Sequence, residues 1–444
     1  MREIYIISLA LNQTKFWSKI INKLKKKNIK IITFDTESSN YLISNNIHIS
    51  ANNKISNKKK DYSLTELIKK FKYYKVKDFN KLMYHEYIFF GKRNRIQILN
   101  DFLRTLEFFY ETFKNKKNIC FIQEIGGFIP NISAFIFAKN NKLDHYFLET
   151  SFFQNYYHIL KNTINCDPMR NTKQKINFER YLKNIKKFKK INIPKKDELH
   201  FKTPAKKIFN LYNFKRFFIK KFKQIILGHQ FVFGFDFLIL KNSILNYFNY
   251  LRLSKYYSNL DFIEKKSFVY FPLHVPNDFA LTIRSSKYQN QLELIDKIAK
   301  KIYPKKILIK EHPARIGAFN FQSFLKLISK NKNIIIADPK INNILLLEKC
   351  DFIFTINSKA GFEAMVFKKK IFSFGESFYK NSKLVKQISK IENFKNVNYL
   401  NSIKYERLRA DFFKEFTSNL FRGSLYVNET TNVNNFAKSI KKIL

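Results

Sequence analysis

The sequence is poor in cysteine, glycine, proline and acidic residues. Its 444 residues include three cysteines, nine glycines, nine prolines and one tryptophan. The cysteines are far apart and odd in number, which argues against a disulfide framework, and their spacing is not that of a zinc site. They are Cys120, Cys166 and Cys350. Such a chain suits a reducing compartment, so we expect a cytoplasmic protein.

Long apolar runs are missing as well. No stretch of 18 or more uncharged apolar residues occurs, so the sequence predicts no membrane-spanning helix. The longest candidate, 224–240, is interrupted by His229, Gln230 and Asp236. The first residues, MREIYIISLALNQTKFW, lack the small-residue cleavage site of a signal peptide, so we expect a buried strand at 4–9 rather than a leader.

Basic residues greatly outnumber acidic ones. Lys and Arg number 83 against 34 Asp and Glu, which gives a formal net charge of +49. Such an excess predicts a polyanionic partner or an anionic membrane surface. The abundance of Lys, Asn, Ile, Phe and Tyr is equally typical of an A/T-rich genome, so both explanations of the charge stay open.

The hydrophobic pattern predicts two α/β domains. Hydrophobic residues make up 45% of the chain, and its length suits two cores. A strand–helix–strand pattern at 3–34 implies parallel strands. Further strands are expected at 118–123 and 144–148, with a polar loop at 52–60. We therefore expect an N-terminal α/β domain at 1–160.

The rest of the chain divides into three predicted parts. Lysine clusters with interleaved Phe and Tyr predict a basic, mostly helical insert at 161–266, broken by a mobile segment near 192–207. The insert is either a membrane-apposed surface or an ordinary helical region with solvated lysines. Alternating strands and helices return at 267–380, and a helical tail at 381–444 is expected to pack back on the domains.

Two strand ends in the second α/β domain carry chemically useful residues. The strand KILIK ends at Glu311-His312-Pro313, and FIFTI ends at 357–363, sequence NSKAGFE. Ligands of open parallel sheets bind outside the carboxyl ends of the strands. His312 can donate to a phosphate and change charge near neutral pH, while Pro313 fixes the turn. Taken singly, His312 is as readily a structural residue.

The second strand end has the features of an anion site. Ser358 can cap the following helix, whose N-terminal N–H groups and dipole favour a phosphate. Gly361 lets a ligand approach the backbone, and Glu363 is placed to hold ribose hydroxyls. Ser358 alone is explained just as well as an ordinary N-cap.

A third element follows the first strand of the second domain. It reads FPLHVPND over 271–278. At this position it is expected to form the floor of a cleft between the domains, with His274 and Asp278 as polar contacts. Each of these two residues is otherwise explained as a solvent-facing turn residue.

The order of these segments resembles the capsule polysaccharide biosynthesis family. FPLHVPND, SSKY, KEHP, NSKAGFEA and FSFGESFY follow one another within 268–379, about a quarter of the chain. That family includes the β-Kdo transferases of capsule assembly, and the pattern is more distantly similar to polysialyltransferases. The resemblance implies a GT-B fold, with two Rossmann-like domains facing across a cleft and 267–380 binding the nucleotide sugar.

The resemblance also implies a reaction and a donor. The expected enzyme moves an acidic, Kdo-like sugar from a CMP-activated donor to a lipid-linked or glycan acceptor. His312 and Ser358 are then expected to bind the donor phosphate, and Glu363 the nucleotide. Two positions depart from the family: His274 stands where Gln is frequent, and Lys359 where Ser or Thr is frequent. Lys359 adds a phosphate contact or marks a different donor.

Fixed donors at a helix N-terminus can stabilise the leaving phosphate, so we expect no metal and no cofactor apart from the donor. No DxD motif is placed for a metal in the cleft. The catalytic base is expected in the N-terminal, acceptor-side domain, where Glu149 and Glu124 both follow predicted strands. Of the two, Glu149 is ranked first. Each of the two carboxylates is otherwise a surface residue or a helix cap.

The expected partners are the nucleotide-sugar donor, a glycan or glycolipid acceptor and other capsule-assembly proteins. Peripheral contact with the inner face of an anionic cytoplasmic membrane is also expected, and no nucleic acid. Three other functions stay open. They are a CDP-polyol phosphotransferase of the same fold, a non-catalytic nucleic-acid-binding protein, although no RRM or GXXG signature occurs, and an inactive scaffold.

Overall fold

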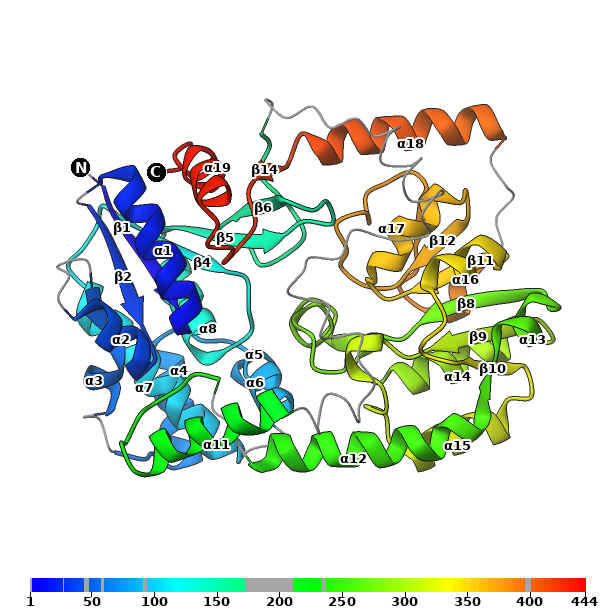
Figure 1. Ribbon diagram of the computed structural model, residues 1–444, viewed down its shortest axis with the longest axis horizontal. Coiled ribbons are helices and arrows are strands. Elements are labelled where there is room, and N and C mark those ends of the chain that lie inside the picture. Colours follow the sequence, from blue (N-terminus) through cyan, green and yellow to red (C-terminus); the bar gives the residue numbers. More distant parts are fainter. Residues whose placement is uncertain are drawn as a thin grey trace. The chain divides into compact units, whose positions relative to one another are not determined.

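The chain forms two compact units (Figure 1). The computed structural model describes residues 2–26, 28–43, 48–56, 60–90, 94–171, 211–233, 237–395 and 401–444. Unit 1 comprises 1–174, 214–239 and 419–444, and unit 2 comprises 175–213 and 240–418. The basic insert expected at 161–266 and the tail expected at 381–444 are therefore each shared between the two units, and the expected domain boundaries stay a prediction. The segment near 192–207 lies outside the described residues.

Unit 1 is built on a mixed sheet. In the described residues its strand order is β14-β6-β5-β4-β1-β2-β3. The strands β5 to β3 in this order are parallel, whereas β6 runs antiparallel to both β5 and β14. The bounds are β1 Glu3–Ser8, β2 Ile29–Thr33, β3 His48–Ser50, β4 Ile119–Glu124, β5 Asp144–Thr150, β6 Tyr156–Lys161 and β14 Phe421–Arg422.

Some helices of unit 1 begin with capping side chains. Ser63 and Glu66 form a capping box at the start of α4, and the Asn94 side chain accepts from two N–H groups at the start of α7. The bounds are α1 Leu11–Leu24, α2 Thr36–Leu42, α3 Ala51–Ser56, α4 Leu64–Tyr73, α5 Phe79–Leu82, α6 Tyr84–Phe89, α7 Arg95–Phe113, α8 Ile129–Asn140, α11 Leu211–Ile225 and α19 Thr430–Ile440.

The loop expected at 52–60 is wrong in its first half, because α3 occupies that part. Ala51 is fully buried and Ile55 packs against the same core, so the two residues form an apolar i, i+4 pair. This short stripe against α7 stabilises a helix in a stretch that is otherwise polar.

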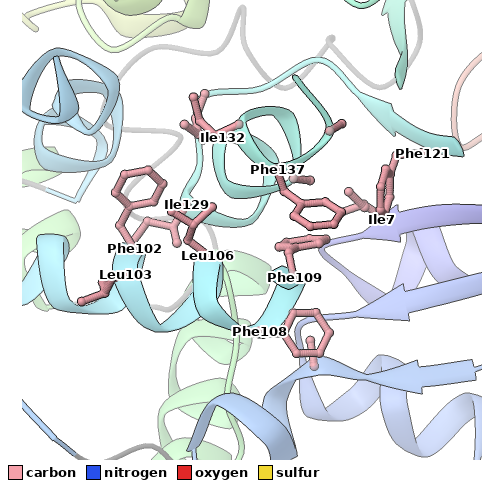
Figure 2. Packing of buried hydrophobic residues seen from close by; sticks show 14 of the residues in the cluster. Ile7, Phe102, Leu103, Leu106, Phe108, Phe109, Phe121, Ile129, Ile132 and Phe137 are labelled. Atoms are coloured by element: carbon pink, nitrogen blue, oxygen red, sulfur yellow. The ribbon is translucent and has the colours of Figure 1, made fainter. Parts of the chain in front are cut away.

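Phenylalanine rings pack against one another in the core of unit 1 (Figure 2). Phe109 on α7 lies 5.9 Å from Phe121 on β4 and 6.1 Å from Phe137 on α8, measured between ring centroids. On another side of the unit, Phe436 of α19 packs 4.9 Å from Phe16 of α1. The last segment of the chain therefore completes the core that the first segment begins.

Unit 2 contains an all-parallel sheet. In the described residues its order is β13-β12-β11-β8-β9-β10-β7. β8 is buried along its whole length, as expected of a central strand covered on both faces. The bounds are β7 Tyr257–Ser258, β8 Phe268–Pro272, β9 Lys306–Lys310, β10 Ile334–Ala337, β11 Phe352–Thr355, β12 Lys370–Ser373 and β13 Val385–Gln387.

The helices of unit 2 follow the expected alternation with the strands. Their bounds are α12 Phe237–Leu253, α13 Leu260–Glu264, α14 Gln291–Ile302, α15 Phe321–Lys330, α16 Asn343–Lys349, α17 Lys359–Val366 and α18 Ser402–Thr417. The predicted fold class, α/β with two units whose sheets are mostly or wholly parallel, is confirmed. None of the helices in the described part of the chain is both long and apolar enough to cross a membrane.

Candidate functional site

Three strand ends lie side by side at the carboxyl edge of the unit 2 sheet. β8 runs between β11 and β9, and all three are parallel. The residues that follow these strands are therefore neighbours, although they lie far apart in the sequence. They include His274 after β8, His312 after β9 and Ser358 after β11.

His274 connects these strand ends. The side chain is only 8% exposed, and its Nε2 accepts from the backbone N–H of Asn357 over 3.4 Å. The Gln291 amide holds the His274 backbone at both its N–H and its carbonyl. Burial, assisted by the neighbouring His312, lowers the pKa of His274 to about 3. The ring is thus a neutral acceptor, a role that a glutamine carbonyl oxygen can also fill.

Ser358 is the N-cap of α17, as predicted. Its Oγ accepts from the Ala360 N–H over 3.2 Å, and its own N–H donates to Thr355 Oγ1 over 3.0 Å. Its carbonyl accepts from the Tyr379 hydroxyl over 2.5 Å. Lys359, the first residue of the helix, is exposed. The start of α17 is therefore fixed on several sides and brings a lysine to the helix N-terminus, where anions bind well.

Asn357, which the sequence reasoning did not single out, holds the loops of this edge together. It is 9% exposed, and its Nδ2 donates to the Ala280 carbonyl over 2.7 Å and to Ser285 Oγ over 2.8 Å. Ser285 Oγ also accepts from the Glu376 N–H over 3.1 Å. The only signal in the sequence was its place directly before the N-cap.

Two buried polar atoms of these loops have no hydrogen-bond partner among the described residues. They are Asn357 Oδ1 and Ser377 Oγ, the latter in a residue that is 2% exposed. An unpaired buried polar group costs about 1–3 kcal/mol.

Gly361 is close to a protein side chain. A Cβ added there would lie 2.5 Å from the hydroxyl oxygen of Tyr379 and 2.6 Å from its Cζ. Tyr379 is fully buried and needs this space to reach the Ser358 carbonyl. The space next to the Gly361 backbone, where we expected a ligand, is occupied by Tyr379. A donor contact of Gly361 stays a prediction.

Glu363 lies in a buried polar network beneath the edge. It is 6% exposed, and its Oε2 accepts from Asn343 Nδ2 over 2.5 Å. The Tyr270 hydroxyl donates to the other end of the Asn343 amide, also over 2.5 Å. Burial raises the pKa of Glu363 to about 7, against the opposing effects of Asn343, Lys359 and Lys310. The ribose contact expected of Glu363 stays a prediction, and one of its oxygens is engaged by Asn343.

Lys310, the last residue of β9, is a second buried charge that the sequence reasoning missed. It is 4% exposed, and burial lowers the pKa of its ammonium to about 8, while Glu363 and Asp338 oppose that shift. Burial thus moves the pKa values of Lys310 and Glu363 toward each other. Its position at a strand end was the available signal.

His312 is exposed and caps the short turn Pro313–Arg315. Its Nδ1 accepts from the Ala314 N–H over 3.1 Å, so the neutral ring carries its proton on Nε2 and can donate from there. Pro313 occupies the first position of the turn, where a missing N–H costs nothing.

The preceding residue, Glu311, is buried and held by two hydrogen bonds. Its carboxylate accepts from the Tyr257 hydroxyl over 2.9 Å and from the Gly317 N–H over 3.0 Å. Burial raises its pKa to about 7. We infer that Glu311 fixes the path of the loop that carries His312.

Asp278 is exposed and caps the turn that follows it. Its Oδ1 accepts from the Ala280 N–H over 2.7 Å, and its carbonyl accepts from Thr282 Oγ1 over 2.8 Å. This is the turn role that the sequence left open, and a contact of Asp278 with the donor stays a prediction.

The two candidate bases belong to the sheet of unit 1. Glu124 is the last residue of β4 and Glu149 the next-to-last residue of β5, so both are strand residues rather than residues that follow a strand. Glu124 Oε2 accepts from Gln13 Nε2 over 3.2 Å, and Glu149 faces His158 across the β5–β6 pair. Both carboxylates are half-buried, and the choice of base stays a prediction. The described residues contain no group of three or more His, Cys, Asp or Glu placed to hold a metal ion.

Comparison with known proteins gives one family. The model of a family described as capsule polysaccharide biosynthesis protein matches residues 131–426, about two thirds of the chain. No curated protein sequence matches this chain.

Several solved structures are similar to the chain at low identity. KpsC of Thermosulfurimonas dismutans, described as a beta Kdo 2,7 transferase, is 12% identical over 99% of both chains, with a TM-score of 0.39. The KpsC of this organism described as a beta Kdo 2,4 transferase is 13% identical over 72% of this chain and 85% of that chain, with a TM-score of 0.35. The UDP-GlcNAc 2-epimerase of Methanocaldococcus jannaschii is 14% identical over 93% and 99%, with a TM-score of 0.28.

Proposed function

Because this chain belongs to the capsule polysaccharide biosynthesis protein family, we propose that it is a glycosyltransferase. In this proposal it moves an acidic, Kdo-like sugar from a CMP-activated donor to a lipid-linked or glycan acceptor. The observation that carries the proposal is the carboxyl edge of unit 2, where the strand ends of β8, β9 and β11 bring His312 and the N-terminus of α17 onto one edge.

The donor phosphate is proposed to bind at this edge. The N-terminus of α17 carries the positive end of the helix dipole, and exposed Lys359 adds a full charge there. His312 can donate from Nε2 toward the same ligand. Fixed donors of this kind stabilise the negative charge that develops on a leaving phosphate, which lowers the barrier to glycosyl transfer.

Buried Lys310 gives this proposal a measurable pH dependence. Its pKa of about 8 leaves part of the population neutral at that pH. A bound phosphate favours the charged ammonium and raises this pKa further. Nucleotide binding is therefore expected to take up protons near pH 8, which calorimetry in buffers of different ionisation enthalpy can measure.

The acceptor hydroxyl needs a base, and we keep the order Glu149 before Glu124. Both lie at the carboxyl ends of neighbouring parallel strands of unit 1. The acceptor, cooperation with other capsule-assembly proteins and a cytoplasmic location are parts of the same proposal.

Alanine variants of the two central residues test the donor site. We expect H312A and S358A to lower release of CMP from CMP-Kdo in the presence of acceptor by roughly 100-fold each, as when other fixed donors are removed. Loss of the Ser358 cap also costs about 1 kcal/mol of stability. The matched control is N401A, which removes the corresponding cap of α18. Transfer that survives in both site variants would rule out the assignment.

A CDP-polyol phosphotransferase is the second candidate. The observation in its favour is Lys359, since an added cation at the helix N-terminus suits a donor whose phosphate is itself transferred. Thermal shifts with CMP, CDP, UDP and GDP select the donor class. Analysis of the product for a transferred phosphate then separates the two reactions. A nucleic-acid-binding protein would instead show binding that weakens steeply with salt.

A further inference from the structure

Helix α11 turns charged side chains toward unit 1. Lys223 forms an ion pair with Glu37, with 2.6 Å between Nζ and Oε1. Lys220 is half-buried, and its ammonium interacts electrostatically with the carboxylates of Glu37 and Asp35. Among the side chains that the structure describes, Phe217, at 8% exposed, is the only buried apolar side chain of the helix. The side of α11 that faces the protein is thus largely polar.

The opposite side of α11 is apolar and exposed to solvent. Phe214, Phe218, Phe222 and Ile225 are 53%, 51%, 57% and 67% exposed, and their i, i+4, i+8, i+11 spacing puts them on one stripe. A surface helix of a globular protein normally turns its apolar stripe to the core. The reversed orientation of α11 indicates that this stripe meets an apolar partner outside unit 1.

The charge of the helix restricts that partner. α11 carries Lys215, Arg216, Lys220, Lys221 and Lys223 and no acidic residue. A second copy of this chain has the same net charge of +49. The segment 172–210 also has an excess of basic residues, 13 against three acidic ones. An apolar partner with negative charge at its surface fits best.

Helix α12 also exposes apolar residues, although its last residue, Leu253, is buried in the core of unit 2. Its inner side donates from Asn249 Nδ2 to the Gly317 carbonyl over 3.1 Å. Its outer side exposes apolar residues, Leu245 and Phe248 at 48% and 52% among them, and the helix contains no acidic residue. Both helices therefore expose apolar side chains and lack acidic residues.

We propose that α11 is an interfacial helix that binds the surface of a bilayer containing anionic lipids. Phe214, Phe218 and Phe222 enter the boundary between headgroups and acyl chains, while Lys215 and Lys221 flank this stripe and contact lipid phosphates. No helix of the described residues is able to span a bilayer, so the contact is peripheral. This binding is separate from the proposed transfer reaction and does not rest on it.

Vesicle sedimentation of the full chain tests the proposal. We expect the wild type to bind vesicles of phosphatidylcholine with phosphatidylglycerol, and to bind pure phosphatidylcholine much more weakly. F218S/F222S should reduce partitioning at least about tenfold per phenylalanine removed from the interface. K215Q/K221Q should reduce it about fivefold per lysine, on anionic vesicles only.

Matched controls come from α4 of the same unit. Leu64 and Ile68 are each 48% exposed at i, i+4 spacing, and Lys69 and Lys72 are exposed lysines. L64S/I68S and K69Q/K72Q should bind vesicles like the wild type. Equal binding by F218S/F222S and the wild type, or no preference of the wild type for anionic vesicles, overturns the proposal. A wild-type dimer in sedimentation velocity that F218S/F222S dissociates assigns the face to self-association and also overturns it.

Discussion

Replacing Gly361 with alanine separates two explanations of this glycine, contact with Tyr379 and room for a ligand. The added Cβ would lie 2.5 Å from the Tyr379 hydroxyl oxygen and 2.6 Å from Cζ. Tyr379 is fully buried and donates to the Ser358 carbonyl. The ring therefore cannot move without breaking this hydrogen bond or compressing its neighbours.

The size of the effect follows from three contributions. Overpacking by one methyl group costs about 1–3 kcal/mol. Loss of the Tyr379 hydrogen bond adds about 1 kcal/mol, and the better helix propensity of alanine returns about 1 kcal/mol. We therefore expect G361A to lower the free energy of unfolding by about 1–3 kcal/mol. For a unit of this size each kcal/mol lowers Tm by about 2–4 °C.

Urea and thermal unfolding of G361A in two backgrounds make the comparison. In Y379L the ring atoms that meet the new methyl group are gone, so G361A should there be neutral or stabilising. An equal effect of G361A in both backgrounds would contradict the packing explanation. A G361A protein with wild-type stability but weaker nucleotide binding would instead indicate that Gly361 leaves room for a ligand.

Two further predictions concern stability against pH. Because the pKa of Glu311 is raised to about 7, the contribution of Glu311 to the free energy of unfolding is largest below pH 4.5 and falls as pH rises toward 7. E311Q should reduce the fall in the free energy of unfolding between pH 5 and 8 by about 3 kcal/mol, measured by urea unfolding. The same fall in the variant as in the wild type refutes this prediction. Glu3 is bound by Lys116, Tyr5 and Lys30, which lower its pKa to about 2, so its contribution is present above pH 4.5 and lost as pH falls through 2. E3Q should flatten acid unfolding in that range, and an acid transition identical to that of the wild type argues against this role.

The alternation of buried strands and amphipathic helices made unit 2 predictable. The strand KILIK, expected directly before Glu311, is found at Lys306–Lys310, and strands and helices alternate through the expected region. Parallel strands share one carboxyl edge, so the neighbourhood of His312 and Ser358 also followed from the sequence. Periodicity of this kind is local, and each residue reports it directly.

The partners of individual side chains were not predictable. The bond between His274 and Asn357 joins residues 83 positions apart, and nothing local marks either residue as the partner of the other. β6 and β14 were missed because β14 is only two residues long and pairs across more than half the chain. Burial of Lys310 and Glu311 likewise depends on the packing of loops around a strand end, which hydrophobic periodicity does not encode.

The scarcity of glycine nevertheless makes each glycine at the site informative. With nine glycines in 444 residues, a glycine at a strand-end loop indicates a close approach that a Cβ would block. Gly361 is approached by Tyr379, and Gly375 by Ser285, whose Oγ also bonds Asn357 and Glu376. In both cases the group that approaches the glycine is a side chain that ties the loop after β12 to the site. Contacts with protein side chains therefore stabilise the edge that is proposed to bind the donor. They hold the N-terminus of α17 in place before a ligand binds.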